Sequence, residues 1–192
     1  MKDHPVTYFD ILDSSGAPTG EIKSYEEVHR NGDWHRAVHV WLVNSKGELL
    51  LQQRSMRVYI RPGIWENTAG GHVDAGHTSL ETAQKELSEE MGIMLPKDAF
   101  EFIATIVDQF ETDTVVGKAI NNEFDDVYIV WLGDTNPDVV INEKEVGGVQ
   151  WMHFTELEQK IKANDPLYMP RQSEYDIIFL FLHKHFDAVI HS

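Results

Sequence analysis

The chain has 192 residues, of which 42% are hydrophobic, and these values suit one globular domain with a sizeable core. Acidic residues outnumber basic ones by 32 to 16, and the net charge of -16 argues against duplex nucleic acid as a partner. The absence of cysteine excludes disulfides, thiolate catalysis and sulfur-based zinc sites. No signal pattern, lipidation motif or bilayer-length apolar run is present, so we expect a soluble, cytoplasmic protein without a membrane partner.

The first part of the chain, about residues 1–34, is expected to form an N-terminal extension. Strand-type residues at 7–12 precede a segment dense in turn formers, which predicts a β-hairpin. Ser24 and Glu27 then have the spacing of a capping box. We therefore expect a hairpin followed by a short helical turn.

A second hairpin is predicted by the β-type runs at 37–43 and 48–54, which are joined by a tight connection containing Gly47. The following segment, residues 55–77, is rich in glycine and shows no sustained period. Long irregular segments in compact domains tend to be functional, so we expect this one to contribute to a site.

The most clearly marked helix begins after Thr78, which forms a predicted capping box with Glu81, and ends at Gly92. The later elements are expected as three strands and two helices. In chain order they are strands at 101–107, 125–132 and 147–154, and helices at 155–161 and 174–186. The last helix is apolar almost all round, which indicates that its surface is buried. A homodimer contact is one way in which part of this surface could be buried. A single α+β domain spanning 1–192 follows.

Three glutamates of the marked helix, Glu86, Glu89 and Glu90, fall within little more than one quadrant of its circumference. An adjacent apolar stripe would dock the helix against the core. A solvated acidic face is the plainer interpretation, but the neighbouring glycine pair Gly70-Gly71 and the irregular segment favour a metal site. A hard cation such as Mg²⁺ binds carboxylate oxygens and cancels their repulsion.

The segment from Gly71 to Ile93 resembles the box of the Nudix family, in which glycine, five residues, glutamate and seven residues precede REUxEExGU, with U aliphatic. The sequence KELSEEMGI fills the end of the box with its spacing kept. Two positions depart from the pattern: His77 replaces the upstream glutamate and Lys85 replaces the arginine.

This resemblance implies an α/β/α sandwich around a mixed β-sheet, with a box at residues 71–93. It also implies a hydrolase that uses Mg²⁺ or Mn²⁺ and cleaves a diphosphate linkage in a small molecule, such as a nucleoside diphosphate derivative, by water attack on phosphorus. Glu89 and Glu90 would bind metal, with the carbonyl of Gly70 as a further ligand. Glu86 would be a ligand or the general base.

We expect the catalytic residues to be Glu86 and Glu89, which match the box, together with His77 and Lys85, which depart from it. Lys85 can still pair with a glutamate as a point charge, although it lacks the bidentate fork of arginine. His77 removes a negative charge; it is either a base near neutral pH or an ordinary loop histidine. We expect hydrolysis to persist at a reduced rate.

The runs LLLQQRS and RPGIWENTAGGHV also resemble isopentenyl diphosphate isomerases, a branch of the Nudix fold. That resemblance implies an alternative metal set. Its members are His29, His35, His72 and Glu123. Gly70 stands where the isomerases need a catalytic cysteine, and Asn121 stands where they have a further glutamate. Hydrolase therefore ranks above isomerase, and a non-catalytic diphosphate-binding module is the third hypothesis.

Several other residues are candidates for binding substrate or metal. Arg54 and Arg61 could contact substrate phosphates. Trp65 could stack on a base, although such a residue is more often a core anchor. Glu123 could complete the metal site of the box. Asp125 and Asp126 are alternatives for this role, but the plainer expectation is that they are surface charges.

Overall fold

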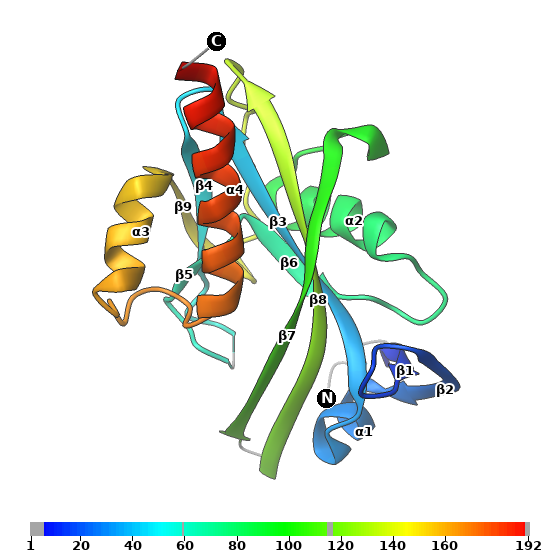
Figure 1. Cartoon of the computed structure of the whole chain (residues 1–192). Helices are drawn as coiled ribbons and strands as arrows, with labels where there is room; N and C mark the ends of the chain where they lie inside the picture. Colours follow the sequence, from blue (N-terminus) through cyan, green and yellow to red (C-terminus); the bar gives the residue numbers. More distant parts are fainter. Residues whose placement is uncertain (1–5, 59, 115–116, 191–192) are drawn as a thin grey trace.

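The structure is a computed structural model that describes residues 6–58, 60–114 and 117–190 (Figure 1). The strands are β1 (Tyr8–Leu12), β2 (Pro18–Ser24), β3 (Trp34–Asn44), β4 (Glu48–Arg54), β5 (Trp65–Glu66), β6 (Ala69–His72), β7 (Phe100–Thr114), β8 (Gly117–Gly133) and β9 (Val146–His153). The helices are α1 (Tyr25–Asn31), α2 (Ser79–Met91), α3 (Phe154–Lys162) and α4 (Gln172–Ile190), with a 3-10 turn at Lys97–Ala99.

Strand β3 is the centre of one mixed sheet. It runs parallel to β8, with His35 opposite Glu123 and Trp41 opposite Ile129, and antiparallel to β4 and β6. β4 continues the sheet to β5 and β9, and β7 forms a long antiparallel ribbon with β8. The predicted hairpin is confirmed at its turn end, where Leu42 and Val43 pair with Leu50 and Leu49, whereas residues 37–40 pair with β6. Both β7 and β8 are longer than predicted.

The sheet separates two helical layers, with α2 on one side and α3 and α4 on the other (Figure 1). Alternate residues of β3 pack against the helices on opposite sides of the sheet, because successive side chains of a strand point to opposite faces. Val38 and Val40 pack with α2, whereas Trp41 and Val43 pack with α3 and α4. The predicted sandwich around a mixed sheet is confirmed.

Helix α4 is buried along much of its length, as its apolar sequence predicts. Tyr175, Ile178 and Leu182 lie in the core beneath the sheet, whereas Leu180 is 72% exposed. Within the described part of the chain, no helix combines the length and apolar character required to cross a membrane.

The N-terminal extension is part of the sheet. The β1–β2 hairpin pairs with β3 at Leu12 and Trp34, and both capping-box hydrogen bonds between Ser24 and Glu27 are present at the start of α1. The expected hairpin and helix are therefore observed. Together they carry Phe9 and His29 to one end of β3 and β8, where the candidate site lies.

The glycine-rich segment at 55–77 is more ordered than its sequence predicts, because it contains β5 and β6. The free edges of β3 and β4 supply hydrogen-bonding partners for these short strands. Gly70 approaches β3 so closely that a Cβ atom there would lie 2.8 Å from the carbonyl oxygen of Val38. The lack of a side chain thus allows the pairing that shapes the site.

Candidate active site

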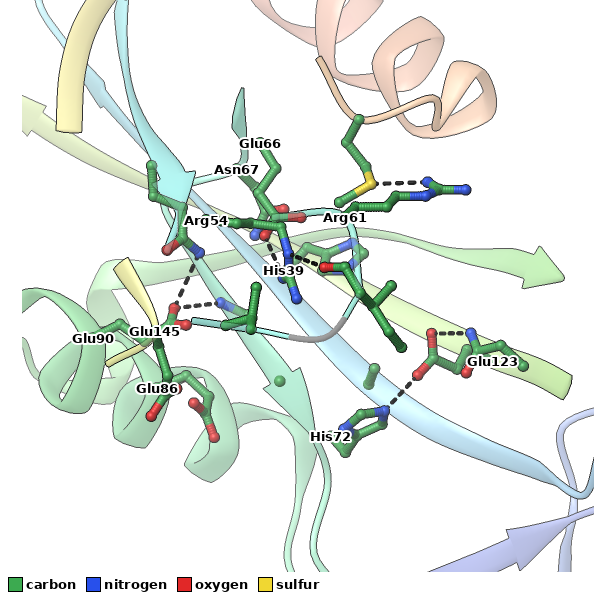
Figure 2. Close-up of a pocket in the computed structure, with 18 of the residues that line it drawn as sticks. His39, Arg54, Arg61, Glu66, Asn67, His72, Glu86, Glu90, Glu123 and Glu145 are labelled. Carbon is green, nitrogen blue, oxygen red and sulfur yellow. Dashed lines mark hydrogen bonds and ion pairs between the residues drawn. The ribbon is translucent and has the colours of Figure 1, made fainter. Parts of the chain in front are cut away.

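A pocket of about 440 Å³ lies between the box helix, the N-terminal extension and the irregular segment (Figure 2). A volume of this size is typical of small-molecule sites. Most of the residues predicted to be functional line it. They are His29, Arg54, Arg61, Gly70, Gly71, His72, Lys85, Glu86, Glu90 and Glu123. The pocket thus brings together segments that are far apart in the sequence.

Helix α2 places two of the three glutamates near its C-terminal end, Glu86 and Glu90, in the pocket. Thr78 caps its start and Gly92 ends it in the left-handed conformation, as predicted. Leu87 is fully buried in the core, and this docking turns Glu86 and Glu90 inward. The Glu89 side chain is 56% exposed, and the residue is not among the described residues that line the pocket.

Backbone and side chains hold Glu86 and Glu90 against β6. The Gly70 N–H and the Gln52 side-chain amide both donate to Oε2 of Glu90, at 3.0 and 3.3 Å. Lys85 Nζ lies 3.5 Å from an oxygen of Glu86. A Cβ atom on Gly71 would lie 2.7 Å from the carboxyl carbon of Glu86, so the glycine makes room for that carboxylate.

Little nearby positive charge balances the negative charges of Glu86 and Glu90. Burial raises the pKa of Glu86 to about 7, against the attraction of Lys85 and with added repulsion from Glu89. Burial and the charge of Glu86 raise the pKa of Glu90 well above its ordinary value. A cation between the two carboxylates would offset the cost of burying their charges and their mutual repulsion. Carboxylate oxygens are the ligands that Mg²⁺ and Mn²⁺ prefer, so the pair fits one of these ions.

A second cluster consists of three histidines and one glutamate, and three of these four residues, His29, His72 and Glu123, line the same pocket. Their potential ligand atoms lie within 4.8 Å of one another. The members are His29 from α1, His35 from β3, His72 from β6 and Glu123 from β8. Parallel pairing of β3 with β8 sets His35 directly beside Glu123. The structure therefore brings the four residues of the alternative metal set close together.

The electrostatics of this second cluster suit a metal ion. Glu123 Oε1 lies 3.2 Å from His35 Nε2 and 2.9 Å from His72 Nε2. His35 Nε2 is buried, and Glu123 is near it without the alignment of a hydrogen bond. Burial, with repulsion from His72 and His35, lowers the pKa of His29 to about 4, so its ring is neutral at pH 7. Neutral imidazoles are good ligands for zinc-like ions.

Glu123 belongs to this second cluster rather than to the box. Figure 2 shows it across the pocket from Glu86 and Glu90, and it groups with the histidines. The expectation that Glu123 completes the metal site of the box is therefore not supported by its position. The aromatic ring of Phe9 stacks on His35 and His72, with centroids 5.3 and 5.0 Å apart, and fixes their planes.

Both predicted phosphate-binding arginines line the pocket but already have partners. Arg54 donates to the carbonyl of Ile60 at 3.0 Å and to Glu66 at 2.8 Å. Arg61 lies with its guanidinium carbon 5.2 Å from the centre of the Phe110 ring. Because each guanidinium has five N–H donors, these contacts leave donors for a phosphate.

Two predicted site residues lie elsewhere. His77 is exposed in the turn before α2, where its backbone N–H donates to Asp74, and it is not among the described residues lining the pocket. Trp65 packs against the core beneath α4 and is likewise absent from that lining. Its placement favours the interpretation as a core anchor. Lys85 does line the pocket, beside Asp74 and Glu86.

The expectation that Asp125 and Asp126 are surface charges is wrong. They are only 1% and 6% exposed. Asp126 accepts hydrogen bonds from Arg36 at 2.8 Å and Thr105 at 2.6 Å, whereas neither oxygen of Asp125 has a hydrogen-bond partner among the described residues. Strand β8 is covered on both faces, which buries even its acidic residues.

Sequence reasoning missed Arg171, a residue at the pocket wall just before α4. Its guanidinium donates to Glu66 and Asn67, each at 3.2 Å, and lies 3.5 Å from Asp108. Burial opposes its charge, but the surrounding carboxylates outweigh this effect and raise its pKa. No local pattern marks Arg171, because its partners come from distant segments.

Comparison with known proteins shows to which family the chain belongs. A model of the NUDIX domain matches residues 33–172. The chain belongs to the Nudix family. It is 44% identical over 173 residues to Nudix hydrolase 3 of Arabidopsis thaliana, covering 88% of this chain but only 22% of that protein.

Two further relatives show the range of the Nudix family. An isopentenyl-diphosphate Delta-isomerase of Pectobacterium atrosepticum is 32% identical over 157 residues, which cover 82% of each protein. The crystal structure of DR0079 from Deinococcus radiodurans superposes with a TM-score of 0.62 at 21% identity, covering 81% of this chain and 89% of that one. The sequence relatives thus include both hydrolases and isomerases, and the structural likeness supports the Nudix fold.

Proposed function

We propose that this Nudix protein is a divalent-metal-dependent hydrolase that cleaves a diphosphate linkage in a small molecule by water attack on phosphorus. One observation carries the proposal: Glu86 and Glu90 face the pocket as a buried, poorly compensated carboxylate pair beside the glycines of β6. Such a pair is costly unless a cation binds it.

In this proposal Glu90, Glu86 and the exposed Glu89 hold Mg²⁺ or Mn²⁺, together with the carbonyl of Gly70. When bound, the ion neutralises charge on the phosphate oxygens. Where Glu86 does not bind the ion, it is instead the general base that takes a proton from water, since burial raises its metal-free pKa to about 7. Lys85 lies beside it and holds it in place through their contact at 3.5 Å.

The basic residues of the pocket would orient the diphosphate. Arg54 is fixed by Glu66 and Ile60, so its remaining N–H groups are pre-organised for a phosphate. Arg61 lines the same pocket and has a positive φ of 49°, which the surrounding segment must hold in place. These two residues would add to the positive charge that Lys85 and Arg171 bring to the pocket.

The test is release of phosphate or of a monophosphate from a panel of diphosphates. The panel comprises nucleoside diphosphates, nucleotide sugars, dinucleoside polyphosphates and prenyl diphosphates, each with Mg²⁺ and with Mn²⁺. Glu89→Gln and Glu90→Gln should lower turnover by on the order of 100-fold or more, because each removes a charge required in the transition state. Glu156→Gln, on the exposed part of α3, is the matched control and should leave turnover unchanged.

An isomerase is the second candidate, because His29, His35, His72 and Glu123 form the metal set that the isomerase resemblance implies. Against it, Gly70 lies where a catalytic cysteine would be required. Incubation with isopentenyl diphosphate decides the matter. Formation of dimethylallyl diphosphate at a catalytic rate would reverse the ranking, whereas hydrolysis without isomerisation supports the first proposal.

A non-catalytic diphosphate-binding module is the third candidate, motivated by the altered His77. It would bind members of the panel without releasing product under any metal condition. The proposed hydrolase instead loses product release when Glu90 is changed to glutamine but retains it when Glu156 is changed. Binding without turnover in the unmodified chain would therefore replace the hydrolase by the module.

The two carboxylate-containing clusters can be separated by their metals. Glu123→Gln should weaken Zn²⁺ binding and spare Mg²⁺-dependent turnover, since Glu123 contacts two imidazoles. Glu90→Gln should have the opposite effect. Calorimetric titration with each metal, combined with turnover, would show one shared site if both substitutions affected both metals equally.

A further inference from the structure

A second cavity, of about 370 Å³, adjoins the pocket that holds the box glutamates. The two hollows have three lining residues in common, namely Arg61, Met169 and Arg171. They are therefore neighbouring compartments that share a wall. The second cavity lies between the irregular segment, the connection that follows α3 and the start of α4.

Side chains form part of the wall between the two cavities. A guanidinium nitrogen of Arg61 lies 2.9 Å from the sulfur of Met169, and Figure 2 shows this contact at the edge of the first pocket. Met169 has a flexible thioether side chain, which can change rotamer at low cost. A ligand group could therefore pass between Arg61 and Met169 with small side-chain movements.

The two compartments differ in chemistry. The first is lined by the box glutamates, the histidine cluster and the two arginines. The second presents mostly hydrocarbon and aromatic surface. Its apolar lining comes from Ile64, Ile161, Pro166, Tyr168, Pro170 and Tyr175. The first compartment suits a charged phosphate group. The second also has polar residues, including Asn164, Asp165 and Gln172, but its mainly apolar surface favours burial of an apolar group.

The size of the second cavity limits the group it can take. An engineered apolar cavity of about 150 Å³ is enough to bind benzene. The second cavity here is larger, at about 370 Å³, so it has room for two fused rings or an apolar group of similar bulk. A five-carbon or smaller group would leave much of its wall without contacts.

We propose that this second cavity binds a bulky apolar group attached to the diphosphate, with Arg61 at the boundary between that group and the phosphates. This inference rests on the proposed function, because it assumes that the diphosphate end occupies the first pocket. It identifies the substrate class as diphosphate esters that carry an apolar group of bicyclic size. Arg61 and Met169 act as positioning residues at the junction.

The test compares two non-hydrolysable methylenebisphosphonate esters, one carrying a naphthylmethyl group and one carrying a methyl group. Their dissociation constants are measured by calorimetry in the presence of Mg²⁺. The unmodified chain should bind the naphthylmethyl ester about tenfold or more tightly, because burial of apolar area adds to the affinity.

Two substitutions fill the cavity from different segments. Ile64→Trp acts from the irregular segment and Gln172→Trp from the first turn of α4. Each should reduce the preference to about threefold or less while leaving the affinity for the methyl ester unchanged. Leu167→Trp is the matched control, because Leu167 is 58% exposed and is not among the described residues lining the cavity. Thermal unfolding identifies any variant that does not fold. The affinities for the two esters are then compared in the variant that does.

The outcomes separate this inference from the proposed function. Equal binding of the two esters by the unmodified chain, or an unchanged preference in a folded cavity-filling variant, overturns the inference even if the chain hydrolyses diphosphates. A cavity-dependent preference without hydrolysis of any diphosphate supports the inference about the cavity and removes the proposed function. Failure to bind either ester overturns both.

Discussion

Gly71 leaves the space that the carboxylate of Glu86 occupies, since a Cβ atom at residue 71 would lie 2.7 Å from Cδ of Glu86. The backbone of Gly71 does not adopt a positive φ, so an alanine there would fit the strand itself. The conflict involves only the end of a flexible side chain. A substitution should therefore move Glu86 and leave the fold in place.

Gly71→Ala is accordingly expected to lower kcat by on the order of tenfold or more, because small displacements of a catalytic group are costly. Its melting temperature should stay close to that of the unmodified chain. Steady-state kinetics and thermal unfolding measure the two effects. Gly148→Ala on β9 is the control, since the nearest atom to a Cβ there is 3.9 Å away. Unfolding of Gly71→Ala, or full activity, would contradict this explanation.

The stability of the metal-free protein should depend on the ionisation of Glu86. Burial raises its folded pKa from 4.5 to about 7, so the folded state favours the protonated form. The resulting stability is fully present below about pH 4.5 and is lost as the pH rises to about 7. The loss is on the order of 3 kcal/mol, because one pKa unit corresponds to about 1.4 kcal/mol.

Mg²⁺ should therefore stabilise the protein more at pH 8 than at pH 5.5, since it binds the ionised carboxylates. Thermal unfolding in EDTA and in Mg²⁺ at the two pH values measures this difference. Glu86→Gln should reduce both the pH dependence in EDTA and the additional stabilisation by Mg²⁺. An equal rise in melting temperature at the two pH values would show that Glu86 does not couple to the metal.

His77 should have little influence on turnover despite its place in the box. It is exposed and does not belong to the described lining of the pocket, so replacing it changes no contact there. His77→Ala and His77→Glu are both expected to keep kcat within about twofold, as is usual for surface substitutions away from a site. A marked acceleration in His77→Glu would instead support the expectation that this departure from the box reduces activity.

Arg171 should be important for stability because it is the basic residue among several buried carboxylates. Arg171→Met would leave Glu66 and Asp108 without this partner, at an expected cost of about 3–5 kcal/mol in the free energy of unfolding. Urea denaturation measures the loss. Arg57→Met, at an exposed position, should change stability by no more than about 0.5 kcal/mol. A similar loss in both variants would remove the specific role of Arg171.

The sequence by itself was sufficient for the features that depend on neighbouring residues. The capping box of Thr78, the stop at Gly92 and the spacing of Glu86 and Glu90 are local, because helix geometry relates residues three and four positions apart. The two ends of the box helix and the start of the short helix after Ser24 were therefore predictable. The family pattern gave the likeness to hydrolases and isomerases from the same local spacing.

Tertiary structure decided how these local pieces face one another. The parallel pairing of β3 with β8 sets His35 beside Glu123, and the docking of α2 turns Glu90 inward while Glu89 stays exposed. The position of Arg171 depends on the path of the chain into α4. Strand pairing and core packing join residues that are distant in sequence, and no local period records which of them will meet. The division of the site into a carboxylate pair on α2, a histidine–glutamate cluster and an adjoining cavity comes from this packing.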